Sequence, residues 1–146
     1  YMLFGNAMIR RKALEESGVF DDTIKSYGGE DTDLSARIWE IYPNSFIFSK
    51  KSNSTHHHRR NLEDFCKAME IYGSQNLPIL IERYPKHKSK FAADWIFTFK
   101  GYILFNTISR FFINILSKIY PAQLIIRYLV VDSVMKGVRR TGKHYR

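Results

Sequence analysis

Residues 27–37 have the sequence YGGEDTDLSAR, in which two glycines lead directly into a group of three acidic residues. Apolar Leu34, Ile38 and Ile41 share one face at helical spacing, so we expect a helix from about residue 32 to residue 41. The glycine pair predicts a backbone that bends sharply or approaches another group closely. The acidic side chains therefore lie at the start of a helix, directly after two glycines that carry no side chain.

Carboxylates at the start of a helix are held by free backbone N–H groups and by the helix dipole, so they stay ionised and fixed in direction. Such a group can accept a proton from a hydroxyl or contact a metal ion. An ordinary N-cap, with Asp31 or Thr32 capping and Asp33 in the first turn, explains the same pattern. A D-x-D triplet that binds a nucleotide-bridging cation usually follows an apolar strand, so we exclude that role for residues 31–33.

Composition and charge narrow the class of protein. The chain has 146 residues, 45% of them hydrophobic, which is enough for one domain with a core. Cys66 is the single cysteine, which excludes an internal disulfide and a thiolate-rich zinc cluster. Residues 1–45 carry five Lys and Arg against eight Asp and Glu, whereas residues 46–146 carry 18 against six. This division indicates carboxylate chemistry at one end and an anionic surface as partner at the other.

Apolar spacing and turn residues predict the remaining elements. Gly18 ends an early helix, Asn61 is the N-cap of a later one and Gly73 ends that helix. The basic segment 86–90 is the best candidate for a domain boundary. The expected elements are a strand-like run over 1–4, a helix over 11–17, a short buried strand over 46–48, a helix over 61–73, a helix over 77–84, helical segments between 91 and 120, and a helix over 122–138.

The second polar cluster is the histidine triplet 56–58, followed by two arginines. Adjacent residues on an extended backbone alternate sides, so His56 and His58 could face one site while His57 faces away. Neutral imidazole is a good ligand for Mn²⁺ or Zn²⁺. A solvated polar turn explains the triplet equally well, so the metal interpretation needs further context.

That context comes from the order of the motifs. Four motifs occur in this order: a G-N-x-x-I-R-R loop at residues 5–11, a G-x-F-D turn at 18–21, the stretch G-G-E-D-x-D-L-x-x-R at 28–37 and a later H-x-H. Together they resemble the second half of family-2 glycosyltransferases with the GT-A fold. The resemblance covers residues 1 to about 75. It implies an α/β fold, with a partial GT-A-like acceptor-side half over 1–85. The residues themselves predict that a basic, mostly helical region follows over 86–146.

The resemblance implies an inverting transfer of a sugar from a nucleotide-diphosphate sugar to an acceptor hydroxyl on a glycan or lipid-linked glycan. Asp31 would be the general base, Glu30 would bind the acceptor or orient the base, and a divalent cation, Mn²⁺ or Mg²⁺, would be held by His56 or His58. The remaining substrate-binding residues that it implies are Gly5, Asn6, Ala7, Gly28, Gly29 and Arg37.

The sequence begins in an apolar run with no signal-peptide pattern, and no nucleotide-binding βαβ unit or strand-borne D-x-D is present. We therefore expect a fragment that is inactive alone.

Residues 91–146 combine aromatic and aliphatic side chains with a recurrent polar stripe and a basic tail. The longest charge-free stretch, Gly101 to Ser109, has nine residues, which is short of the roughly 20 of a spanning helix. The pattern suits helices lying on an anionic membrane, and equally a helical hairpin packed on the catalytic part. With the first interpretation, the protein is cytoplasmic and peripheral to the inner face of the cell membrane.

The amino-acid sequence is also compatible with two functions other than that of a glycosyltransferase. A pI near 9.7 and abundant aromatics fit a small nucleic-acid-binding domain. However, the basic residues are interleaved with apolar helices and the N-terminal part is acidic, so no nucleic-acid partner is expected. The other alternative is a membrane-surface interaction domain without catalysis.

Overall fold

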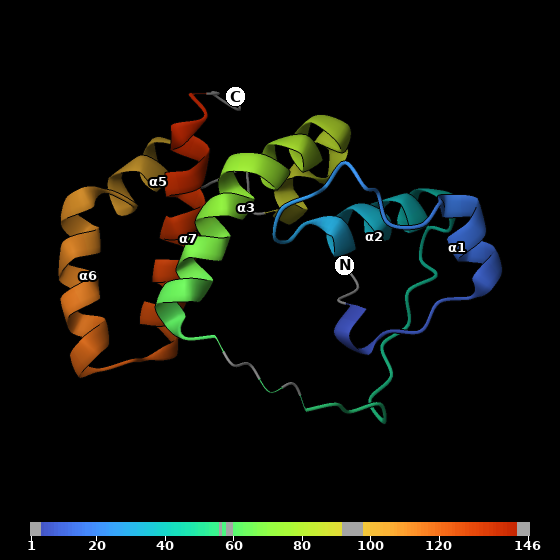
Figure 1. The fold of residues 1–146 in the computed structure, drawn as a ribbon, viewed down its shortest axis with the longest axis horizontal. Coiled ribbons are helices and arrows are strands. Elements are labelled where there is room, and N and C mark those ends of the chain that lie inside the picture. The colour runs from blue at the N-terminus through green and yellow to red at the C-terminus, as the bar shows by residue number, and fades with distance from the viewer. Residues whose placement is uncertain (1–3, 56, 58–59, 92–97, 143–146) are drawn as a thin grey trace. The chain divides into compact units, whose positions relative to one another are not determined.

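The computed structural model describes residues 4–55, 57, 60–91 and 98–142, and Figure 1 shows them as helices joined by irregular segments. The chain divides into two compact units, Tyr1–Arg59 and Arg60–Arg146. No strand occurs among the described residues, so the predicted α/β, partial GT-A-like fold is wrong.

The physical reason is visible at the expected strands. Phe4 begins a 3-10 helix, and the rest of the run over 1–4 lies outside the described residues. The segment 46–48 is irregular, and Ile47 and Phe48 are 92% and 86% exposed rather than buried. A β-strand needs a neighbouring strand to pair its N–H and C=O groups, and the described chain offers none. Apolar composition alone was not sufficient evidence for a sheet.

The described residues of the first unit form three helices. The 3-10 helix η1 spans Phe4–Asn6, α1 spans Arg11–Ser17 and α2 spans Glu30–Ile41. The helix predicted over 11–17 is confirmed with the same bounds. Helix α2 begins two residues earlier than predicted, because Gly29 rather than Asp31 or Thr32 is its N-cap residue.

The second unit contains α3 (Leu62–Arg83), the 3-10 helix η2 (Pro85–Phe91), α5 (Phe99–Leu104), α6 (Thr107–Ile119) and α7 (Gln123–Arg140). Asn61 caps α3 as predicted, since its side chain accepts a hydrogen bond from Asp64 N at 2.8 Å. In contrast, Gly73 does not end this helix, which continues through Pro78 to Arg83. The division of the chain into 1–85 and 86–146 stays a prediction.

Helix α7 lies between α3 and α6 in this unit (Figure 1). Leu77 and Ile81 of α3 form a buried cluster with Val138 of α7. A second buried cluster joins Met135 of α7 to Phe105, the residue that follows α5. Two ion pairs, from Glu70 of α3 to Lys136 and Arg140, reinforce the contact. Within the ranges described, no helix combines the length and apolarity that crossing a membrane requires.

Glycine explains how closely α3 and α7 approach. A Cβ atom added at Gly137 would lie 2.1 Å from the backbone oxygen of Glu70, and one at Gly73 would lie 2.2 Å from that of Val134. Both distances are too short for any side chain, and the obstacle in each case is backbone rather than a flexible group. Gly73 is therefore a packing residue, which is why it does not act as a helix stop.

We predict that Gly137→Ala lowers the free energy of unfolding by about 1–3 kcal/mol, because overpacking of two backbones outweighs the gain of about 1 kcal/mol in helix propensity. Urea unfolding followed by circular dichroism measures the effect. Gln75→Ala, at an exposed position of α3, is the matched control and should change stability by less than about 0.5 kcal/mol. A Gly137→Ala protein that is as stable as the parent would contradict the close approach.

Candidate functional site

The candidate site is the start of α2, where the glycine pair precedes the acidic cluster. Gly28 and Gly29 have φ angles of +78° and +102°, a left-handed conformation that favours glycine. The carbonyl of Gly29 accepts a hydrogen bond from Asp33 N at 2.8 Å, which closes the first turn of the helix. Glu30 and Asp31 therefore occupy the first turn, beside backbone N–H groups that have no partner within the helix.

The glycine cap changes the interpretation of Asp31. A capping residue uses its side chain to accept from the backbone, but glycine has none, and α2 has no side-chain cap. Asp31 is thus not the N-cap, and the ordinary capping explanation of its presence does not apply. Asp31 is half-buried and takes part in further interactions within the fold.

Glu30 carries the observation that most directly indicates a ligand. Its Oε2 atom is inaccessible to solvent and has no hydrogen-bond partner among the residues that the structure describes. Leaving a buried acceptor without a partner costs about 1–3 kcal/mol, and more when the group is charged. A hydroxyl or other donor of a bound molecule would remove this cost once the groups that cover this oxygen move aside.

Asp33 and Arg37 hold the start of α2 against the end of α1. The Asp33 carboxylate is fully buried and accepts from Arg37 Nε at 3.0 Å, and its ion pair to the Arg37 guanidinium measures 2.9 Å. The same guanidinium donates to the backbone carbonyl of Ser17 and, at 2.7 Å, to that of Val19. These bonds fix the direction in which the first turn of α2 points.

A second hydrogen bond joins the C-terminal end of α2 to α1. The Tyr42 hydroxyl donates to the Glu16 carboxylate, and this hydrogen bond raises the pKa of Tyr42. Because α2 is attached to α1 near both ends, its first turn cannot rotate freely. The orientation of Glu30 and Asp31 is consequently a property of the whole first unit.

The other predicted site residues lie in two places. Gly5, Asn6 and Ala7 are exposed in and after η1, and Asn6 Nδ2 donates to Ser52 O at 3.2 Å, which links this turn to the loop before the histidines. His57 is exposed, whereas His56 and His58 lie outside the described residues. Within the described ranges, no group of three His, Cys, Asp or Glu side chains could hold a metal ion. Arg37, predicted to bind substrate, uses its donors within the fold, a role that the sequence pattern did not indicate.

The second unit contains a pocket of about 180 Å³ between α3, α6 and α7. Its charged groups are joined to one another: Glu70 to Lys136, and Asp132 to Arg110 by two hydrogen bonds. The bonds to Asp132 raise the pKa of Arg110. Because these groups already satisfy one another, the pocket is less suited to a charged ligand than the start of α2.

Comparison with known proteins identifies no relative: no family model, curated protein or solved structure matches the chain.

We predict that Asp33→Ala lowers the free energy of unfolding by about 2–3 kcal/mol, somewhat less than the 3–5 kcal/mol typical of a fully buried pair because Arg37 retains solvent contact. Thermal or urea unfolding measures the loss.

Glu63→Ala is the matched control, since Glu63 and Lys67 form an ion pair with the same i,i+4 spacing on an exposed surface. This substitution should leave the unfolding midpoint within experimental error. Equal effects of the two substitutions would show that the Asp33–Arg37 pair does not hold α2.

Proposed function

We propose that this chain provides the acceptor-binding part of an inverting glycosyltransferase, with Asp31 as the general base and Glu30 as a contact to the acceptor. The observation that carries the proposal is the solvent-inaccessible, unpartnered Glu30 Oε2 in the first turn of a helix that opens on two left-handed glycines. The order of motifs from residue 5 to residue 37 supports the same function. The proposal does not require the GT-A fold, which the described residues lack.

The chemistry follows from the groups at this helix start. The acceptor hydroxyl gives its proton to the Asp31 carboxylate while its oxygen attacks the anomeric carbon, and the bond from that carbon to the nucleoside diphosphate breaks. A base held in place typically contributes about 10²–10⁴-fold to the rate. The glycine pair leaves space for the acceptor, and the hydroxyl of the acceptor, or one beside it, satisfies Glu30 Oε2.

A divalent cation, Mn²⁺ or Mg²⁺, is part of the proposal, with His56 or His58 as a ligand. Such an ion neutralises the charge that develops on a leaving diphosphate. Gly5, Asn6 and Ala7 belong to the proposed substrate-binding surface, together with Gly28 and Gly29. Because Arg37 is engaged in the fold, we assign its contribution to the orientation of α2.

The partners in this proposal are a nucleotide-sugar donor and a glycan or lipid-linked acceptor, without nucleic acid. In this proposal the chain binds the acceptor, and binding of the nucleotide is not assigned to its residues. Because a lipid-linked acceptor is held in a membrane, we propose a cytoplasmic location, peripheral to the inner face of the cell membrane.

We predict that Asp31→Asn in the complete enzyme lowers sugar transfer by at least about 10²-fold while donor binding is retained, because the amide cannot accept the proton. Release of nucleoside diphosphate from a panel of UDP- and GDP-sugars, with membrane lipid extract as acceptor, measures transfer. Glu40→Gln, near the other end of α2 and exposed, is the matched control and should transfer sugar at the parent rate. Normal turnover in Asp31→Asn would remove Asp31 as the base.

The metal assignment has its own test. We expect either His56→Ala or His58→Ala to raise the Mn²⁺ concentration needed for half-maximal transfer, because one imidazole ligand is lost, while His57→Ala leaves it unchanged. Titration of EDTA-treated enzyme with MnCl₂ gives these values. If all three variants respond to Mn²⁺ as the parent does, the histidines are not ligands.

A further inference from the structure

Helix α6 is attached to the second unit through its polar side. Arg110 forms two hydrogen bonds to the buried Asp132 of α7, and the partly buried residues of α6 are Ser109, Arg110, Ile113 and Ser117, only one of which is apolar. Asn106 caps the helix by accepting from the N–H groups of Ile108 and Ser109 at 2.8 and 3.0 Å. This is the reverse of an ordinary surface helix, which packs its apolar side inward.

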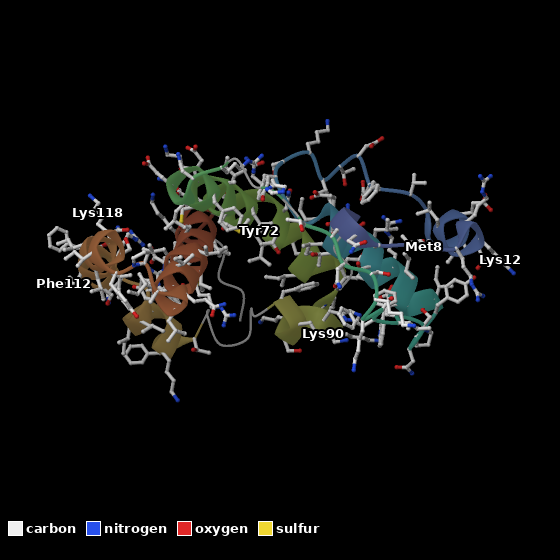
Figure 2. The ribbon with its side chains drawn as sticks, turned by 90° about the horizontal axis from the view of Figure 1, so that it is seen from below. Met8, Lys12, Tyr72, Lys90, Phe112 and Lys118 are labelled. Carbon is white, nitrogen blue, oxygen red and sulfur yellow. The ribbon has the colours of Figure 1, made fainter. Side chains whose placement is uncertain are left out.

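The apolar side of α6 consequently faces outward. Six residues at helical spacing form one continuous strip, which we call the α6 apolar face, and no residue of α6 is fully buried. Phe112 is 64% and Ile119 is 76% exposed. Figure 2 shows Phe112 on the side of α6 that is turned away from α7. The members of the face are Ile108, Phe111, Phe112, Ile115, Leu116 and Ile119.

The elements that precede and follow α6 in the chain also expose apolar side chains. Phe99, Ile103 and Leu104 of α5 are exposed, as is Leu124 at the start of α7. Monomeric soluble proteins rarely expose so many large apolar side chains side by side, and a surface of this kind usually marks an interaction site. The clustering on one helix pair separates it from isolated exposed residues such as Met8.

Charge identifies the partner. Residues 95–131 contain no Asp or Glu and four Lys or Arg, of which Arg110 is paired with Asp132 and the other three are exposed. Lys118 lies about two turns after Phe111 on the same side of α6, at the edge of the apolar face. Lys100 and Arg127 are exposed on the neighbouring helices. Large apolar side chains next to unopposed cations match a bilayer whose headgroups are anionic, because lipid tails take the first and phosphates take the second.

We propose that the α6 apolar face lies in the interface of an anionic lipid bilayer, with the helix parallel to the membrane plane and Lys100, Lys118 and Arg127 near lipid phosphates. A helix of 13 residues is about 20 Å long, which suits a surface position. This inference goes beyond the proposed sugar transfer and does not depend on it, because the two rest on different units of the chain.

Vesicle flotation with the 146-residue chain tests the inference. We expect the chain to float with vesicles of 70% phosphatidylcholine and 30% phosphatidylglycerol, to float less with phosphatidylcholine alone, and to be released as NaCl rises from 50 to 500 mM, because salt screens the headgroup charge. The double substitution Phe111→Ser with Phe112→Ser should lower the partition coefficient at least about tenfold, because two phenyl groups no longer leave water.

Phe48→Ser is the matched control, since Phe48 is 86% exposed in the other unit and should not affect binding. Circular dichroism shows whether the double variant keeps its helices. As a measurement that needs no loss of binding, an environment-sensitive fluorophore on Phe112→Cys, in a Cys66→Ser background, should shift to the blue with anionic vesicles, whereas the same label on Phe48→Cys should not.

Three results would overturn the inference: no flotation with anionic vesicles, flotation of the double variant equal to that of the parent, or a label at position 112 that stays in water. A parent that is dimeric by light scattering, binds no vesicle and becomes monomeric in the double variant would instead make the face a contact between two copies. Vesicle binding by Asp31→Asn should equal that of the parent, which separates this inference from the proposed function.

Discussion

The close approach of α3 and α7 is the constraint on which the second unit depends. It is possible because Gly73 and Gly137 present no side chains where the two backbones meet. The contact brings Val138 onto Leu77 and Ile81, and it places Lys136 and Arg140 beside Glu70. Non-directional burial provides most of the stabilisation in such an interface, while the ion pairs fix how the helices are rotated about their axes.

The position of α6 follows from that arrangement. Asp132 lies on α7, and its bidentate contact with Arg110 holds α6 by its polar side. Tyr128 of α7 also donates to the carbonyl of Leu104, at the end of α5, at 2.9 Å. The aromatic and aliphatic residues of α6 are left outside as a result. Two helices packed through glycine thus determine, through one buried carboxylate, which surface the unit presents.

In the first unit, too, the contact between a buried carboxylate and an arginine holds two helices together. Arg37 joins a buried carboxylate of α2 to the carbonyls of Ser17 and Val19, so one cation aligns two helices. The two left-handed glycines then bring the chain into α2 with Glu30 and Asp31 in its first turn. The candidate site needs both features, because the glycines provide access and the Arg37 bonds provide a fixed direction.

Local signals in the sequence were reliable where local physics decides the outcome. Asn61 is an N-cap because its side chain can reach the N–H three residues on, and α1 has the predicted bounds because Gly18 follows it. Apolar runs were less reliable, since Phe46, Ile47 and Phe48 suit a buried strand only where another strand is available. The expected break at Gly73 failed for a related reason: packing against α7 keeps α3 helical through Gly73 and Pro78.

The sequence by itself determined the division of charge, the acidic cluster after two glycines and the apolar, cation-bordered pattern of residues 99–119, because these properties need only composition and helical spacing. Only the tertiary structure decided which side of each helix is covered. The burial of Asp33, the unpartnered oxygen of Glu30 and the outward apolar face of α6 depend on how the folded elements pack, which helical spacing does not specify. Helical periodicity places residues on a common face, but it does not state whether that face meets protein, lipid or water.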